Sequence, residues 1–191
     1  MKVGLFFGSF NPIHIGHMVL ANYMLEFTDL DRVWFVVSPH NPLKNKNSLL
    51  DEKQRLHLVN LAIGDNTKLK ASNIEFKLPQ PSYTINTLTY LKEKYPQHQF
   101  ALIMGADNLE SFHKWKNFEE ILKYYELYVY PRPSSDGGKL KDHKKVKWVS
   151  APLMEISSTL IRKAIKDKKD VRYFMPEEAW QYAKEMHFYK K

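Results

Sequence analysis

The sequence contains no cysteine, which excludes a disulfide framework, a thiolate zinc site and a cysteine nucleophile. Long apolar runs are also absent: the longest, such as residues 33–37 and 100–104, fall far short of the roughly 18 residues that a membrane span needs. The apolar stretch near the N-terminus is interrupted at Asn11, Pro12 and His14 before a cleavable leader could form. We therefore expect a cytoplasmic protein that does not cross a membrane.

Arginine is scarce, because only 5 of the 29 basic residues are arginine and the rest are lysine. The net charge of +8 favours an anionic partner, which could be nucleic acid, a membrane surface or a phosphorylated small molecule. The planar guanidinium group of arginine binds phosphate or carboxylate through two hydrogen bonds at once. Each arginine within a motif is therefore a candidate anion ligand.

The remaining composition is that of a globular protein. The chain has 191 residues, of which 43% are hydrophobic and 14% aromatic, and this excludes disordered and low-complexity classes. The length fits one domain of about 100–200 residues, so we expect a single domain over residues 1–191.

Short apolar runs alternate with segments of helical periodicity. Strands are predicted at 2–7, 32–38, 68–77, 99–104, 127–130 and 146–149, and helices at 14–27, 51–63, 82–94, 118–124, 158–166 and 177–186. This alternation favours an α/β fold with a parallel sheet covered by helices on both faces. The Gly- and Lys-rich segment from Arg132 to Lys145 indicates a mobile loop, and its lysines, with Lys147, are expected to be solvated.

The segment leaving the first predicted strand, residues 8–17, reads Gly-Ser-Phe-Asn-Pro-Ile-His-Ile-Gly-His. Gly8 permits a tight turn with exposed amides, and the following helix start, with His14 and His17 on one face, suits a polyphosphate. Neither a Walker loop nor a Gly-x-Gly-x-x-Gly fingerprint is present. Taken alone, His14 and His17 allow two alternative interpretations. They could be ordinary histidines at the start of a helix, or part of a metal site that would still need a third ligand.

This segment resembles the His-x-Gly-His signature of the nucleotidyltransferase superfamily of adenylyl- and cytidylyltransferases. A second segment, residues 156–162 (Ile-Ser-Ser-Thr-Leu-Ile-Arg), resembles the superfamily's Ile-Ser-Ser-Thr-x-Ile-Arg motif. Read physically, Ser157 or Ser158 can cap a helix and Arg162, one turn further, can reach the same anion. Alone, the second segment would also fit a capped surface helix. The resemblance implies a Rossmann-like, doubly wound parallel sheet.

Four intermediate segments resemble one branch, the bacterial nicotinate mononucleotide adenylyltransferases. They are residues 38–44, 81–88, 104–109 with the downstream Trp115, and 130–133. Asn11 and Asn86 stand where Asp is common in that family, so a carboxylate role at these positions is in doubt.

The resemblance implies transfer of AMP from ATP to nicotinate mononucleotide, giving nicotinate adenine dinucleotide and pyrophosphate in NAD biosynthesis. It implies four catalytic residues, His14, His17, Lys44 and Arg162. His17 would stabilise charge at the α-phosphate, and His14, Lys44, Ser157 and Arg162 would bind the departing phosphates. The implied ATP-binding residues are Gly8, Ser9, Phe10, His14, His17, Gly105, Asp107, Ile156, Ser157 and Arg162.

The implied residues for nicotinate mononucleotide are Lys44, Tyr83, Thr84, Trp115 and Arg132. Tyr83 and Thr84 would receive the nicotinate carboxylate, Trp115 would stack on the pyridine ring, and Arg132 would reach the mononucleotide phosphate. No protein metal site is expected, and Mg²⁺ would be bound through the substrate phosphates.

Alternatives to this activity remain. One is the same chemistry with nicotinamide mononucleotide or phosphopantetheine as acceptor, or a cytidylyl transfer. Another is a nucleic-acid-binding protein, which would gather basic and aromatic residues on one surface; no such motif is legible, so no nucleic acid is expected as partner. A homo-oligomer is compatible with the sequence, which leaves the oligomeric state open.

Overall fold

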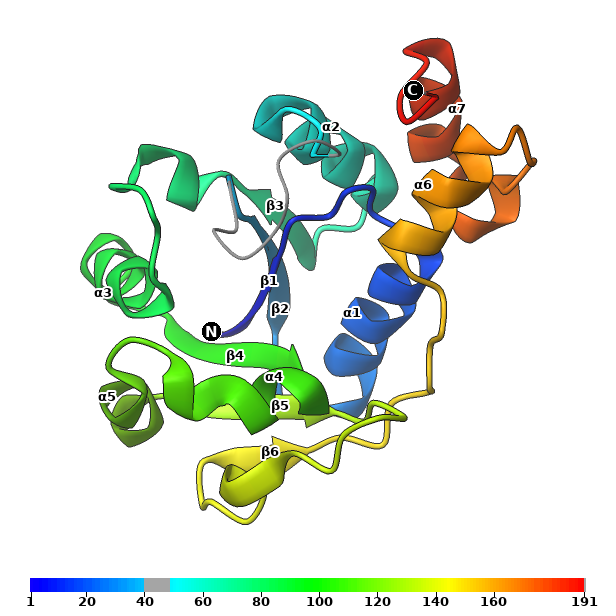
Figure 1. The fold of residues 1–191 in the computed structure, drawn as a ribbon. Helices are drawn as coiled ribbons and strands as arrows, with labels where there is room; N and C mark the ends of the chain where they lie inside the picture. The colour runs from blue at the N-terminus through cyan, green and yellow to red at the C-terminus, as the bar shows by residue number, and fades with distance from the viewer. Residues whose placement is uncertain (40–48, 191) are drawn as a thin grey trace.

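The computed structural model describes residues 1–39 and 49–190. Six strands form one sheet in the order β3-β2-β1-β4-β5-β6, and all neighbours pair in parallel (Figure 1). The strands are β1 (Lys2–Gly8), β2 (Arg32–Val37), β3 (Leu69–Ser72), β4 (Gln99–Gly105), β5 (Glu126–Tyr130) and β6 (Val146–Trp148). The helices are α1 (Ile15–Phe27), α2 (Glu52–Ile63), α3 (Thr84–Lys94), α4 (Ala106–Ser111), α5 (Phe118–Tyr124), α6 (Ser158–Lys166) and α7 (Glu177–Glu185).

The two faces of the sheet bury separate cores because successive side chains of a strand point to opposite sides. In β2, Phe35 belongs to the core under α1, α2, α6 and α7, whereas Trp34 belongs to the core under α3, α4 and α5. Figure 1 shows these two groups of helices on opposite sides of the strands. The arrangement confirms the predicted α/β fold, a Rossmann-like doubly wound parallel sheet with helices on both faces.

The strand order reverses at β1, which pairs with β2 on one side and β4 on the other. In such sheets a crevice opens beyond the carboxyl ends of the strands at this point. Helices α1, α3, α4 and α6 each begin at that edge, because each follows a strand and runs back along the sheet. The two signature segments therefore meet the same edge. In the described ranges no helix is long and apolar enough to cross a membrane.

One local prediction needs correction. The strand expected over residues 68–77 ends at Ser72, where its pairing with β2 stops, and residues 74–77 form a 3₁₀ turn closed by a hydrogen bond from the Phe76 amide to the Asn73 carbonyl. The predicted loop, residues 132–145, makes hydrogen bonds to neighbouring elements. Ser135 Oγ donates to Glu110 of α4 at 2.7 Å, and Trp148 Nε1 donates to the carbonyl of Lys141 at 2.9 Å.

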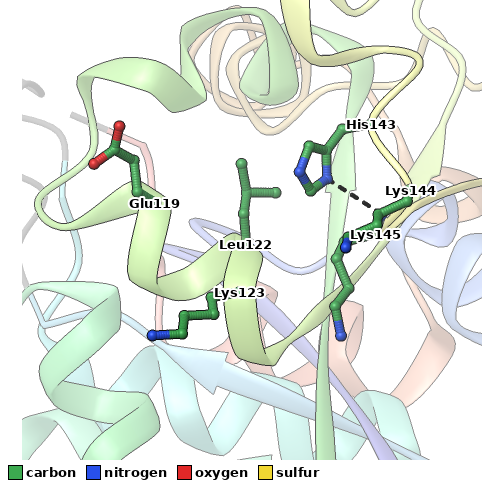
Figure 2. A pocket seen from close by; sticks show the side chains of 6 residues that line it. All are labelled: Glu119, Leu122, Lys123, His143, Lys144 and Lys145. Carbon is green, nitrogen blue, oxygen red and sulfur yellow. Dashed lines mark hydrogen bonds between the residues drawn. The ribbon is translucent and has the colours of Figure 1, made fainter.

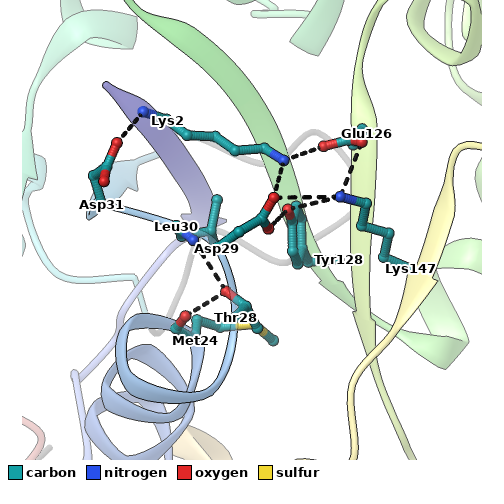
Figure 3. A network of polar contacts seen from close by, with 9 residues as sticks. All are labelled: Lys2, Met24, Thr28, Asp29, Leu30, Asp31, Glu126, Tyr128 and Lys147. Carbon is teal, nitrogen blue, oxygen red and sulfur yellow. Dashed lines mark hydrogen bonds and ion pairs between the residues drawn. The ribbon is translucent and has the colours of Figure 1, made fainter.

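A polar network joins β1, β5 and β6 at the amino edge of the sheet (Figure 3). Lys2 pairs with Asp29 and Glu126, and Lys147 pairs with the same two carboxylates. The hydrogen bonds from Lys2 and from the Tyr128 hydroxyl hold the pKa of Asp29 well below its ordinary value. Lys147 was expected in a solvated cluster, but it lies in β6 and belongs to this network.

Candidate active site

The turn after β1 is built around Gly8 and Phe10. Phe10 has a positive φ of 44° and is only 2% exposed. A Cβ at Gly8 would lie 2.8 Å from the Phe10 ring, so the turn requires glycine there. The Phe10 ring packs edge-on against the imidazole of His17, with 5.1 Å between centroids. Phe10, expected to bind ATP, thus supports His17 from the core and does not line the cleft described below.

His14 and His17 form one stacked unit at the start of α1. Their rings are 3.7 Å apart with an interplanar angle of 27°, and the His14 backbone N–H donates to His17 Nδ1 at 3.2 Å. Because Nδ1 of His17 accepts a hydrogen bond, the proton of the neutral imidazole belongs on Nε2. Gly16 gives the stack its room, since a Cβ there would lie 3.1 Å from the His14 ring.

His14 is buried and electrically neutral at pH 7. Burial, together with the positive charge of Arg132, lowers the pKa of His14 to about 4. The side chain is 6% exposed, and its Nδ1 has no hydrogen-bond partner among the described residues. Buried polar atoms are normally satisfied, so an unpaired ring nitrogen at a cleft is a candidate contact point for a ligand.

Hydrogen bonds join the second signature segment to the first. Arg162 Nη1 donates to the carbonyl of Asn11 at 2.8 Å, and Ser158 Oγ donates to the carbonyl of Pro12 at the same distance. Ser157 caps α6 by accepting the Leu160 amide at 3.2 Å. Between the segments lies a cleft of about 540 Å³, and the expected ATP-binding residues that line it are Ser9, His14, His17, Ile156, Ser157 and Arg162.

Two other expected ATP-binding residues, Gly105 and Asp107, lie beside Arg132, which lines this cleft. Asp107 in α4 faces Arg132, with 3.7 Å between Oδ1 and Nε. A Cβ at Gly105 would crowd that Asp107 oxygen and would lie 3.1 Å from the Arg132 side chain, so a larger residue where β4 meets α4 would displace these two side chains. Arg132 itself lines the cleft with His14, and its buried Nε makes no hydrogen bond within the described ranges. The residue expected at the mononucleotide phosphate therefore lines the same cleft as residues expected to bind ATP.

Arg55 in α2 is fully buried. Its guanidinium donates to four backbone carbonyls, those of Ser9 at 2.6 Å, Ser38 at 2.8 Å, Pro39 at 2.7 Å and Leu50 at 2.8 Å. It thereby ties the turn after β1 to the end of β2. Its spacing from Leu58 and Val59 places it on the apolar face of α2, which was the sequence signal for burial.

Asn11 shows why a carboxylate is dispensable at this position. Its Oδ1 accepts hydrogen bonds from the Leu50 amide at 3.2 Å and from the Tyr189 hydroxyl at 2.8 Å. Both are neutral donors that an amide oxygen satisfies. The departure from Asp at residue 11 therefore fits a structural role, in which Tyr189 near the C-terminus is fastened to the first signature segment.

The segments expected to bind the mononucleotide come together at the start of α3 and ahead of α5. Lys116 Nζ lies 4.4 Å from the centroid of the Tyr83 ring, so residues 115–116 adjoin residues 83–84. Trp115 is half-buried and packs against the buried ring of Phe112, with 4.8 Å between centroids. Thr84 is half-buried and its hydroxyl makes no hydrogen bond within the described chain.

A buried carboxylate that the sequence did not reveal lies under this segment. Glu75 is 3% exposed; its Oε1 accepts the Thr87 hydroxyl at 2.8 Å and its Oε2 the Ser82 hydroxyl at 3.2 Å. Burial raises its pKa, against the effect of these hydrogen bonds. Glu75 thus holds both ends of the segment that carries Tyr83 and Thr84. Lys44, expected in both substrate sites, lies outside the described residues.

Comparison with known proteins decides the family. Residues 5–164 match the Cytidylyltransferase-like family. A protein of Flavobacterium psychrophilum described as a probable nicotinate-nucleotide adenylyltransferase is 57% identical, and the match covers 100% of both chains. A protein of Bacteroides thetaiotaomicron with the same description is 46% identical over 97% of this chain and 92% of its own. This chain belongs to the nicotinate-nucleotide adenylyltransferases.

The fold of this adenylyltransferase is shared with solved structures. One is the nicotinic acid mononucleotide adenylyltransferase of Plasmodium falciparum complexed with NaAD, which aligns with a TM-score of 0.80 at 17% identity and covers 98% of this chain and 97% of its own. At that identity the likeness shows the fold. The family assignment confirms the predicted nucleotidyltransferase activity and the predicted branch.

A second groove of about 490 Å³ lies apart from the site of this adenylyltransferase (Figure 2). It is formed by the end of α5 and the residues before β6, so it lies at the amino ends of β5 and β6, opposite the signature segments. None of the expected site residues lines it; the lining residues are Glu119, Leu122, Lys123, His143, Lys144 and Lys145.

Proposed function

We propose that this adenylyltransferase uses the cleft between its two signature segments to transfer AMP from ATP to the 5′-phosphate of nicotinate mononucleotide. The observation that carries the proposal is the junction of the stacked His14 and His17 with Arg162 at one cleft. The segment of Tyr83 and Thr84, at the start of α3, lies at the same carboxyl edge of the sheet. The cleft supplies cationic and neutral donors suited to a polyphosphate, and the second segment supplies hydroxyl groups and aromatic rings for a pyridine nucleotide.

The reaction needs no protein nucleophile. An oxygen of the acceptor phosphate attacks the α-phosphorus of ATP, forming a new P–O bond, and the bond to the β-phosphate oxygen breaks with its electron pair leaving on pyrophosphate. The protein contributes positioning and charge stabilisation. His17, whose neutral form carries its proton on Nε2, donates to the α-phosphate as negative charge accumulates in the transition state.

Neighbouring side chains bind the rest of the substrates. His14, Ser157, Arg162 and Lys44 bind the departing phosphates. Arg132, already in the cleft beside His14, contacts the attacking phosphate, and Asp107 accepts a hydrogen bond from ribose of the adenosine half. On the acceptor side Trp115 stacks on the pyridine ring, while Tyr83 and Thr84 receive the nicotinate carboxylate.

We propose that Mg²⁺ is held through the substrates. Among the described residues no group of three or more His, Asp or Glu side chains could hold a metal ion, and Asp107 faces Arg132. The donors of the cleft are imidazole, hydroxyl and guanidinium groups, which suit phosphate and not a hydrated hard cation. Held through the phosphates that His14, Ser157 and Arg162 are proposed to bind, Mg²⁺ would supply positive charge that stabilises the leaving pyrophosphate.

Pyrophosphate release tests the proposal directly. The purified protein is incubated with ATP, Mg²⁺ and one of nicotinate mononucleotide, nicotinamide mononucleotide or phosphopantetheine, and the product is identified by mass. We expect nicotinate adenine dinucleotide, with kcat/KM for the acid mononucleotide at least about 10²-fold above that for the amide. Equal values would overturn the acceptor assignment, and no release with any acceptor would overturn the transfer itself.

A further inference from the structure

We propose that Lys116 is a specificity-determining residue whose ammonium group favours an acceptor carrying a carboxylate over one carrying an amide. The inference rests on the proposed function, because it assigns a role within the acceptor site. The residue lies directly after Trp115, and its Nζ is held 4.4 Å from the centroid of the Tyr83 ring. The charge therefore projects across the gap between the two acceptor segments.

The charge of Lys116 has no carboxylate partner in the described part of the chain. None of the ion pairs among the described residues involves Lys116, although other lysines such as Lys2, Lys141 and Lys147 have carboxylate partners. Lys116 instead rests on the Tyr83 ring, and a cation–π contact positions an ammonium group without cancelling its charge. A carboxylate delivered beside Thr84 would supply the missing anion.

The electrostatics of the segment make such a cation useful. Glu75 lies beneath it, bonded to the hydroxyls of Ser82 and Thr87. A carboxylate in this position repels an anionic acceptor whenever it is ionised and does not repel a neutral amide. Lys116, whose exposed side chain rests on the Tyr83 ring, has the reverse effect. Discrimination between two isosteric acceptors arises from such paired attractive and repulsive charges.

Removing the charge should therefore change the selectivity and not only the rate. For Lys116→Gln we expect kcat/KM for nicotinate mononucleotide to fall about 10-fold, while kcat/KM for nicotinamide mononucleotide changes less than about 2-fold. Lys116→Arg keeps the charge and the cation–π contact, so the wild-type ratio should persist. The KM for ATP should not change in either variant, because Lys116 does not line the ATP cleft.

The matched control is Lys114→Gln. Lys114 has the same charge and is also exposed, two residues earlier, but it makes no contact with the Tyr83 ring. The acid-to-amide ratio of kcat/KM is measured for all four proteins at saturating ATP, with circular dichroism to show that each is folded. A ratio that falls only in Lys116→Gln supports the proposal. An unchanged ratio in Lys116→Gln, or an equal fall in Lys114→Gln, overturns it. Failure of the wild-type protein to adenylylate nicotinate mononucleotide would instead overturn the proposed function.

Discussion

Arg162 Nη1 and the backbone carbonyl oxygen of Asn11 lie 2.8 Å apart, although the two residues are separated by 151 positions in the sequence. The bond fixes the end of the second signature segment on the turn of the first. Nη2 of the same guanidinium donates to Thr159 at 3.3 Å, so Arg162 is held in place before any anion arrives. A preorganised cation loses little freedom when phosphate binds.

Arg162→Lys tests whether the guanidinium group binds a phosphate in addition to the Asn11 carbonyl. Lysine keeps the positive charge but cannot bind the Asn11 carbonyl and a phosphate with a planar fork, so we expect the Kd for ATP to rise about 10-fold. Net charge does not change, and isothermal titration calorimetry measures the difference. An exposed arginine, Arg172 of the pair with Asp170, provides the control, since Arg172→Lys should leave the Kd unchanged. Equal affinities in wild-type and Arg162→Lys protein would show that the guanidinium does not bind ATP.

His17→Ala should lower kcat at least about 10²-fold, because it removes a hydrogen bond aimed at charge that develops in the transition state. The fold should survive, since the His14 amide that donates to His17 can bond to water at the edge of the cleft. Single-turnover measurement of pyrophosphate release at saturating substrates reports the chemical step. His143→Ala, in the groove at the amino edge of the sheet, is the matched control and should keep wild-type turnover. Wild-type kcat in His17→Ala would contradict the mechanism.

The sequence was most informative where local pattern and tertiary structure agree. Residues 2–7 and 99–104 are buried strands next to glycines, and helix α6 has the predicted bounds, Ser158–Lys166. The two signature segments also carry their chemistry in contiguous residues, so His14, His17 and Arg162 could be assigned to one site from the sequence alone. The β3 boundary was missed because Ser72 and Asn73 end a strand through loss of a pairing partner, which periodicity does not report.

Residues that act through distant contacts could not be predicted in this way. Glu75 becomes part of the acceptor segment only because the 3₁₀ turn before Pro79 folds back on Ser82 and Thr87. Tyr189 meets Asn11 across 178 positions. Arg132 matched a short motif, but that motif did not reveal its position beside His14. There its positive charge adds to the effect of burial in lowering the pKa of His14. Such relationships depend on the order of strands in the sheet.

ATP binding should be accompanied by protonation of His14. Its pKa of about 4 in the free protein lies below the ordinary value of 6.5, so between these two pH values the free imidazole is neutral. A bound polyphosphate favours the charged form and raises the pKa, so ATP binding takes up a proton in this range and strengthens as pH falls through it. NMR titration of the histidine rings, with and without a non-hydrolysable ATP analogue, measures both pKa values. His14→Asn assigns the resonance, and an unshifted pKa would place the anion elsewhere.

Arg55→Met should destabilise the protein strongly. Four backbone carbonyls lose their donor at a buried position, and the unfolding free energy should fall by at least about 3 kcal/mol. The unfolding free energy of Arg55→Lys should lie between those of the wild-type protein and Arg55→Met, because one ammonium group cannot reach all four oxygens. Urea denaturation followed by circular dichroism provides the values, with Arg172→Met as a control in which the midpoint should not move. A wild-type midpoint in Arg55→Met would mean that water satisfies the carbonyls equally well.

Thr84→Val should narrow the preference for the acid acceptor. The Thr84 hydroxyl is half-buried at the first turn of α3 and bonds to no other described residue, so it is available to donate to a carboxylate oxygen. Valine has nearly the same shape, so stacking on Trp115 persists while one donor to the ligand is lost. We expect kcat/KM for nicotinate mononucleotide to fall about 10-fold. The amide mononucleotide should lose less, because its own N–H groups gain nothing from a donor. Thr89→Val on the same helix is the control: its hydroxyl is exposed and already donates to the carbonyl of Ile85 at 3.0 Å, so its acid-to-amide ratio should match that of the wild-type protein. If Thr84→Val also keeps that ratio, the carboxylate is recognised by backbone amides or by Lys116 without help from this hydroxyl.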